Sequence, residues 1–451
     1  MCIGLLMHLF IRKRKNLVLL PFMMMVTMPS YAADMAQSFE KLAQTPVLHE
    51  GRIKPLDSFA RANLKDFSGS EDGAMLWLVQ TIFDPARAED VPILKIVNPD
   101  IRILLNLEKR ESKLYSSREV LAGILPRREM IEELLRQDEN KLSPQQRDLL
   151  IVHRQLSDLQ DIFSSISHYL PLSIDIPADV PEPLSQFKGK NISLSDITPY
   201  REQLENALKG IIETKGNNLD AYNEGEQILA HLSYTSGLLS EAGSQSLLFK
   251  SIPVGENEMV TPWQAELQQR GDTQITSIWK DLARSYHETD KQAWHDNIDR
   301  LHDYYYADKS FEFRTDALLV EYYYNKYTPF YASFVLCLIA LGVLIIGAFT
   351  QKAAFLKSVL SPLLTMSIIL QTAGISARIF ILDRPPVSTL YETVLFVCAL
   401  AMFYMVIMYW RHKKALWVWL CVCLGLILHI LGLTIVLNYV DHYKIVFPDM
   451  V

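Results

Sequence analysis

Residues 329 to 349 read PFYASFVLCLIALGVLIIGAF, a stretch that contains no charged residue. An α-helix needs about 20 apolar residues to cross a hydrocarbon core roughly 30 Å thick. The stretch therefore predicts a membrane-spanning helix, and the rest of the chain can be placed relative to it.

Three more apolar segments lie in the last quarter of the chain, at about 358–382, 390–410 and 415–440. Basic residues separate the first span from the second and the third from the fourth; they are Lys352, Lys357, Arg411, Lys413 and Lys414. Because Lys and Arg concentrate in cytoplasmic loops, both connections should face the cytoplasm. The loop after the second span and the tail 441–451 should then face outward. We expect a membrane domain over 327–440 with four spans.

The N-terminus has the pattern of a secretory signal. Arg12 to Lys15 are all basic, an apolar run follows over 17–28, and Ser30 and Ala32 form a small-residue exit. The apolar run is short for a span. Residues 1–33 are therefore predicted to be a cleaved signal peptide or, alternatively, an N-terminal anchor with the same orientation. Either one exports the region 34–326.

The exported region is acidic. The chain has 44 Lys/Arg and 51 Asp/Glu; 12 of these basic and 4 of these acidic residues lie in 1–33 and 327–451, which leaves 32 against 47, or −15, for the middle. Nucleic-acid binding needs clustered Lys and Arg, so we expect no nucleic-acid partner. The five cysteines (Cys2, Cys337, Cys398, Cys421 and Cys423) all lie outside this region, so its core must hold it together without a disulfide.

Most of the exported region is predicted to be helical, which gives an all-α fold class. Ser143, Pro144 and Gln146 form a helix-start pattern, with an apolar period of 3.6 after it. A second long helix is expected over 217–248, and another is expected to open at Thr289. The prolines between 170 and 199 indicate an extended linker or a subdomain joint.

Tyrosines gather on either side of position 315, in 304–306 and in 322–327. They could stack on a flat cofactor such as haem. They could also form an aromatic belt at headgroup depth, where amphipathic rings are favoured. Their position just before the first span favours the belt.

The outward loop between the second and third spans holds the candidate binding residues. Thr389 and Glu392 fit a helix capping box without any further role. Arg378, Arg384 and Tyr391 gather at the same mouth, and two guanidinium groups there suit a carboxylate or phosphate. The partner could be a haem propionate or a lipid headgroup.

His429 lies deep in the fourth span among apolar residues. Ionisable residues at that depth are costly and are candidates for function. A neutral imidazole could be an axial ligand to haem iron. It could equally hydrogen-bond to a neighbouring helix, and the sequence leaves both readings open.

Three separated stretches together resemble the CcsA/ResC-type cytochrome c biogenesis proteins of system II. They are RPPVSTLYE (384–392), HEGRIKPLDSFAR (49–61) and EYYYNK (321–326). The resemblance implies haem handling in the bacterial inner membrane: haem is held at an outer Trp-rich site between histidines and joined to the CxxCH cysteines of apocytochrome c. It implies a periplasmic N-terminal domain and, as partners, apocytochrome c and a CcsB/ResB-type membrane protein. Arg378, Arg384, Tyr391 and His429 would contact the haem.

The chain also departs from the family pattern. The Trp-rich motif and its flanking histidines do not follow the spans, and Ser388-Thr389 replaces an Asn. We therefore expect the N-terminal part of a longer or split protein, with a separate C-terminal haem-motif polypeptide as partner, and assign no catalysis to this chain alone. The alternative is a membrane scaffold or sensor with an exported partner-binding domain. A transporter subunit is disfavoured because no series of coupling carboxylates runs through the spans.

Overall fold

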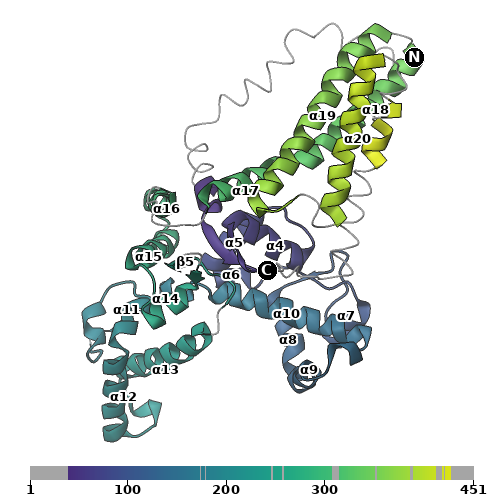
Figure 1. Cartoon of the computed structure of the whole chain (residues 1–451). Helices are drawn as coiled ribbons and strands as arrows, with labels where there is room; N and C mark the ends of the chain where they lie inside the picture. The colour runs from purple at the N-terminus through teal and green to yellow at the C-terminus, as the bar shows by residue number, and fades with distance from the viewer. Residues whose placement is uncertain are drawn as a thin grey trace, which may run out of the picture.

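The structure is a computed structural model that describes residues 39–172, 174–177, 179–244, 247–255, 258–306, 314–350, 353–385, 390–412, 419–420 and 422–427. Two parts are evident in Figure 1: a large, mostly helical domain, and a bundle of long helices that projects from it. The helix α17 (Thr315–Tyr327) lies between them.

The domain is built from many short and medium helices and three two-stranded sheets. The helices are α4 (Leu56–Ser68), α5 (Ala74–Phe83), α6 (Pro85–Ala88), α7 (Pro99–Leu104), α8 (Ser117–Ile124), α9 (Arg128–Leu135), α10 (Pro144–Ser164), α11 (Leu194–Ile197), α12 (Arg201–Lys215), α13 (Glu224–Ser244), α14 (Pro262–Gln268), α15 (Thr273–His287) and α16 (Lys291–Tyr306). The antiparallel sheets pair β1 (Pro46–His49) with β2 (Arg52–Pro55), β3 (Leu94–Lys95) with β4 (Leu114–Tyr115), and β5 (Ile252–Gly255) with β6 (Glu258–Val260). The chain is thus mostly helical as expected, but the strictly all-α prediction missed these small sheets.

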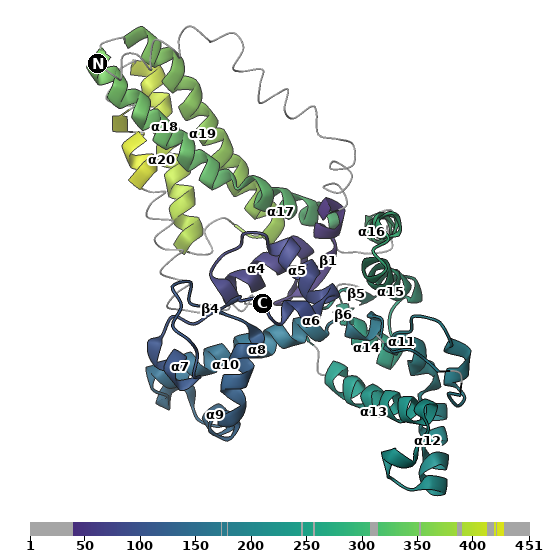
Figure 2. The same cartoon turned by 180° about the vertical axis from the view of Figure 1, so that it is seen from behind.

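Two hydrophobic cores hold the domain. The larger one gathers α4, α5, α10, α15 and α16, with Phe249 edge-on to both Phe59 and Trp279 at 5.8 and 5.5 Å. The smaller one lies under α11, α12 and α13 and includes the buried Trp263. Figure 2 shows α12 and α13 standing apart from α7 to α10. The Pro-rich stretch lies where the chain passes from the first core to the second, as expected for a subdomain joint.

Helix α10 begins as the sequence predicts. Ser143 accepts from the backbone N–H of Gln146, and the Gln146 side chain accepts from the backbone N–H of Ser143, at 3.2 and 2.8 Å. Two N–H groups that the helix itself leaves unsatisfied are thereby paired.

Replacing Ser143 by Ala should lower the free energy of unfolding by about 1 kcal/mol, because one of these donors loses its acceptor. Denaturant unfolding of the detergent-solubilised chain would measure this change. Ser112→Ala is a suitable control because Ser112 is exposed and caps no helix; an equal loss in both variants would contradict the capping role.

The tyrosines of the two groups have different surroundings in the structure. Tyr305 is 1% exposed and donates to the Ser251 carbonyl at 2.5 Å, and Tyr306 donates to the Gln44 carbonyl at 2.9 Å. The belt interpretation is therefore wrong for these two, which belong to the domain core. Tyr323, Tyr327 and Tyr331 are exposed beside the first long apolar helix, where a belt would lie.

The projecting bundle contains α18 (Pro329–Thr350), α19 (Ala353–Leu382) and α20 (Leu390–His412). Three helices of the described residues are long and apolar enough to cross a membrane, and they match the first three predicted spans. The predicted fourth span, 415–440, falls mostly outside the described residues. Large apolar side chains such as Ile346, Ile369 and Phe403 are about half exposed on the bundle surface, as expected for helices that face lipid.

Helices α17 and α18 meet at a sharp break. Thr328 has φ of +40°, and Pro329 follows it as the first residue of α18. A residue before proline is disfavoured in the helical region, so α17 ends there. The break lets α17 lie against the domain while α18 enters the bundle (Figure 1).

Candidate functional site at the junction of the two parts

The hairpin of β1 and β2 contributes the residues of the domain that contact α17. Strands β1 and β2 are joined by Glu50 and Gly51, with φ of +51° and +77°, as a two-residue type I′ turn requires. The turn leads directly into Arg52, and the chain then enters α4 at Leu56. Asp57 and Ser58 therefore lie in the first turn of α4.

Glu321 on α17 joins this hairpin to the start of the bundle. The Arg52 guanidinium donates to both carboxylate oxygens of Glu321, at 2.5 and 2.9 Å, and Ser58 Oγ donates to Glu321 Oε1 at 2.7 Å. The Glu321 side chain is only 8% exposed. Bidentate pairing of this kind fixes orientation as well as distance.

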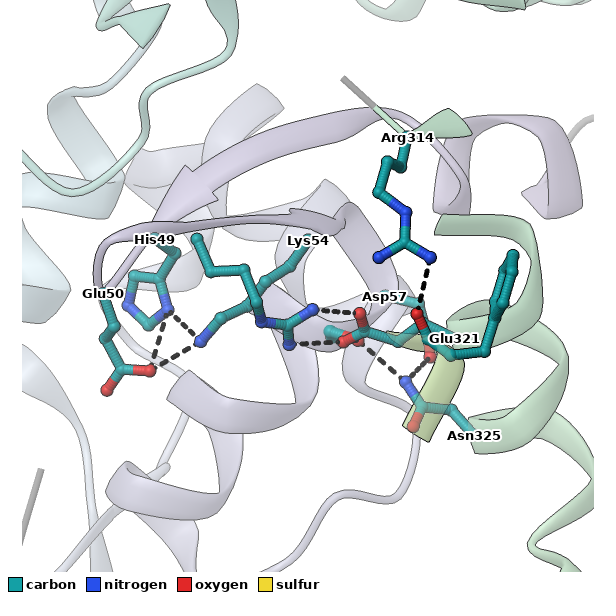
Figure 3. Close-up of polar contacts among 10 residues, drawn as sticks. His49, Glu50, Lys54, Asp57, Arg314, Glu321 and Asn325 are labelled. Carbon is teal, nitrogen blue, oxygen red and sulfur yellow. Dashed lines mark hydrogen bonds and ion pairs between the residues drawn. The ribbon is translucent and has the colours of Figure 1, made fainter. Parts of the chain in front are cut away.

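Asn325 continues the contact one helical turn further along α17. Its Nδ2 donates to Ser58 Oγ at 2.8 Å and to Asp57 Oδ2 at 3.2 Å, and Arg61 Nε donates to the same Asp57 oxygen at 2.8 Å. Glu321 and Asn325 share a helix face because they are four residues apart. Figure 3 shows the Asn325 side chain joined to Asp57 by a dashed line. We call Arg52, Asp57, Ser58, Glu321 and Asn325 the junction site.

His49 lies at the turn of the hairpin, where it is paired with Arg52 on the other strand, and it is next to Glu50 and Lys54 (Figure 3). Burial, helped by the positive charge of Lys54, lowers the pKa of His49 to about 4. The ring meets Phe59 edge-on at 5.0 Å. His49 is therefore neutral near pH 7 and packs as an aromatic residue.

Arg314, which precedes α17, contacts the C-terminal end of α19. Its Nη2 donates to the Phe380 carbonyl at 2.9 Å, and its guanidinium lies 4.8 Å from the centre of the Phe380 ring. A cavity of about 250 Å³ lies between the hairpin, α17 and the end of α19. Its walls are mostly apolar and carry Arg52, Arg314 and Glu321 as polar groups.

The predicted arginines at the outer mouth of the bundle do come together. Arg378 donates to Glu392 Oε1 at 2.8 Å, and Arg384 Nη2 lies 3.7 Å from the same oxygen. The Glu392 side chain is 3% exposed. Glu392 is therefore an ion-pair partner of both arginines, and the capping box alone did not account for it. We call these three residues the mouth cluster.

The mouth cluster adjoins the junction site through α17. Helix α17 packs against α19, which carries Arg378, and Tyr324 of α17 lies near enough to Arg378 to interact with its charge. Tyr391 lies in the first turn of α20, but its side chain falls outside what the structure describes, and His429 lies outside the described residues altogether. Among the described residues, no three His, Cys, Asp or Glu side chains gather where they could hold a metal ion.

Reasoning from the sequence did not predict the five junction-site residues as a site. The stretches that contain them, 49–61 and 321–326, resemble the family, but nothing in the sequence indicated that the two stretches are in contact. One signal was present: Glu321 and Asn325 are polar residues spaced by four on a helix that leads directly into a membrane span.

No protein-family model matches this chain, and no curated protein matches it either.

Proposed function

We propose that this chain is a component of the cytochrome c maturation machinery of the bacterial inner membrane, with its large helical domain on the periplasmic side. The observation that carries the proposal is the meeting of the three stretches that resemble the CcsA/ResC-type family. Stretches 49–61 and 321–326 share the junction site. The second stretch lies on α17, which packs against α19, and Arg378 of α19 pairs with Glu392 of the third stretch. Residues more than 260 positions apart in sequence thus line one region at the outer end of the bundle.

In this proposal haem is the cargo, and the mouth cluster receives its propionates. The cluster has two guanidinium groups and one carboxylate, so it keeps a net positive charge that suits an incoming carboxylate. Arg384 is the better candidate for that contact, since it is 3.7 Å from Glu392 and 38% exposed, whereas Arg378 is closer to Glu392 and less exposed. Axial ligation by His429 and a contact from Tyr391 stay predictions.

The proposed partners are a C-terminal haem-motif polypeptide, a CcsB/ResB-type membrane protein and apocytochrome c. The acidic helical domain would act as a docking or chaperone element for one of them. Its net charge of −15 favours a partner with a basic surface.

The second candidate function is a non-enzymatic membrane scaffold or sensor. One observation favours it: Glu392 already pairs with both arginines, so the mouth cluster is electrostatically satisfied in large part without any ligand. In that case the domain would bind a partner protein, and the purified chain would carry no haem with any partner.

The test uses a strain that lacks the chromosomal gene and is complemented with the intact chain or with Arg384→Ala. We expect the variant to lower the level of haem-stained cytochrome c several-fold, because the contact to the haem carboxylate is lost. Lys209→Ala, a change at an exposed position on the distant helix α12, is the matched control.

The same cells provide the second measurement. The solubilised chain, purified together with the product of the neighbouring reading frame, should show a haem Soret band that weakens in Arg384→Ala. If the co-purified proteins carry no haem and Arg384→Ala leaves cytochrome c unchanged, the haem proposal is rejected and the scaffold is favoured.

A further inference from the structure

Three sulfur atoms from two helices meet inside the bundle. Cys337 lies on α18, and Cys398 and Met402 lie on α20, all with exposed fractions of 1% or less. Cys398 Sγ is 3.9 Å from Met402 Sδ. Cys337 belongs to the same cluster of buried side chains as Cys398 and Met402. We call Cys337, Cys398 and Met402 the sulfur cluster.

The sequence spacing brings these residues to one depth. Cys337 follows Pro329 by eight positions, and Cys398 follows Leu390 by eight. At a rise of about 1.5 Å per residue, both thiols lie roughly 12 Å inside the same end of the bundle. Met402 is four residues after Cys398, so it shares the inward face of α20.

A glycine of the following helical segment closes the cluster. A Cβ on Gly425 would lie 3.1 Å from Met402 Sδ and 3.5 Å from Cys337 Sγ. Both sulfurs therefore border the same backbone position, and a side chain there would displace them. Because Gly425 has no side chain, the two sulfur atoms can pack against its backbone.

Helix α19 adds hydrogen-bonding groups to this apolar interior. Ser367 Oγ lies 3.3 Å from Cys337 Sγ and 2.8 Å from Ser333 Oγ. Gln371 lies near Cys398, and neither polar atom of its side chain has a hydrogen-bond partner among the described residues. Ser367 and Gln371 are both completely buried. Polar groups at such depth are costly, and the Gln371 amide has a donor left over that would stabilise a thiolate in this interior.

We propose that the sulfur cluster binds one Cu(I) ion. Thiolate and thioether ligands are soft and select Cu(I) among the first-row metals. With metal–sulfur bonds of about 2.3 Å, two ligands of a trigonal site lie about 4.0 Å apart, which the 3.9 Å between Cys398 and Met402 matches.

The charge balance also favours a monovalent ion. On binding, one S–H bond breaks, the proton leaves to water, and the thiolate electron pair forms the metal bond, with no change in oxidation state. One thiolate, one thiol and one thioether then hold Cu⁺ in a neutral site. A divalent ion on the same ligands would leave a net positive charge in the low-dielectric interior. The inference rests only on the bundle and does not depend on the proposed function.

The test is an anaerobic titration of the intact, solubilised chain with Cu(I) in competition with a chromogenic Cu(I) chelator. We expect the intact chain to retain one Cu(I) per chain, and Cys337→Ser and Cys398→Ser to lose this binding. Met402→Leu keeps the side-chain volume, so the variant should still fold. Its affinity for Cu(I) should fall by at least roughly tenfold, because even changes to residues that only support the metal ligands lower metal affinity by that factor.

The matched control is Cys423→Ser, because Cys423 is an exposed cysteine on the segment that carries Gly425. It should bind Cu(I) as the intact chain does. X-ray absorption of the loaded protein should show sulfur neighbours only. The proposal is overturned if the intact chain yields all its Cu(I) to the chelator, or if Met402→Leu and Cys398→Ser bind as tightly as the intact chain.

Discussion

Replacing Glu321 by Ala should lower the free energy of unfolding by about 3 kcal/mol, at the low end for a broken buried ion pair. The change leaves the Arg52 guanidinium without its carboxylate and removes the acceptor for Ser58. We expect the smaller loss of unfolding free energy because the Arg52 side chain is 29% exposed, so water can solvate part of the unpaired guanidinium. Denaturant unfolding of the solubilised chain measures the change.

Two control variants make this result specific to the junction site. Glu132→Ala breaks the Arg128–Glu132 pair, whose side chains are 79% and 45% exposed, and should cost less than about 1 kcal/mol. The double variant Arg52→Met with Glu321→Met removes both charges and should lose less stability than Glu321→Ala alone. A Glu321→Ala cost no larger than that of Glu132→Ala would contradict a buried pair.

Acidification should destabilise the domain through His168. This imidazole lies between Tyr169 and Trp263, with ring centres 3.9 and 4.2 Å away. Burial, assisted by the positive charge of Lys280, lowers the pKa of His168 to about 3. Between pH 6.5 and 3 the unfolded chain therefore binds a proton that the folded chain does not, so stability falls with falling pH and is unaffected above pH 6.5.

The expected loss from this one residue is about 4 kcal/mol on going from pH 6.5 toward pH 3, at about 1.4 kcal/mol per pH unit. His168→Phe keeps an aromatic ring in the stack and should shift the acid-unfolding midpoint of the solubilised chain to lower pH. The exposed His231 offers the control, and His231→Gln should leave the midpoint near its original value. An unchanged midpoint in His168→Phe would refute the assignment.

The sequence predicted the elements that depend on local patterns. An uncharged run over 329–349 was enough for the first span, and the observed helix α18 covers it. The capping pattern at Ser143 was enough for the start of α10. Both features are set by residues within one helix, where period and cap chemistry act without tertiary context.

The junction site could not be predicted in this way, because Arg52 and Glu321 are separated by 269 positions. The hairpin that presents Arg52 was missed for a related reason. Its strands have four residues each and begin or end with proline at Pro46 and Pro55, so they give little alternation to detect.

Glu392 illustrates how a sufficient local explanation can hide a tertiary one. The spacing Thr389-x-x-Glu392 fits a capping box, which seemed to account for the acid. In the structure its carboxylate is buried against Arg378, fourteen positions earlier. Two arginines that seemed to require an external anion thus have a partner within the chain. Arg384, the more distant and more exposed of the two, keeps the capacity for a ligand.

The central claim is that the helical domain is joined to the bundle through the hairpin and α17, and we propose that this junction lies on the outer side of the membrane. Its most direct test places cysteines at Ser58 and Asn325, whose side-chain atoms Oγ and Nδ2 are 2.8 Å apart, and adds a short, membrane-impermeant bismaleimide to intact spheroplasts. We predict a crosslink without permeabilisation, and none for the control pair at Ser58 and the exposed Lys209. A crosslink that requires permeabilised membranes, or no crosslink at all between positions 58 and 325, would contradict the account.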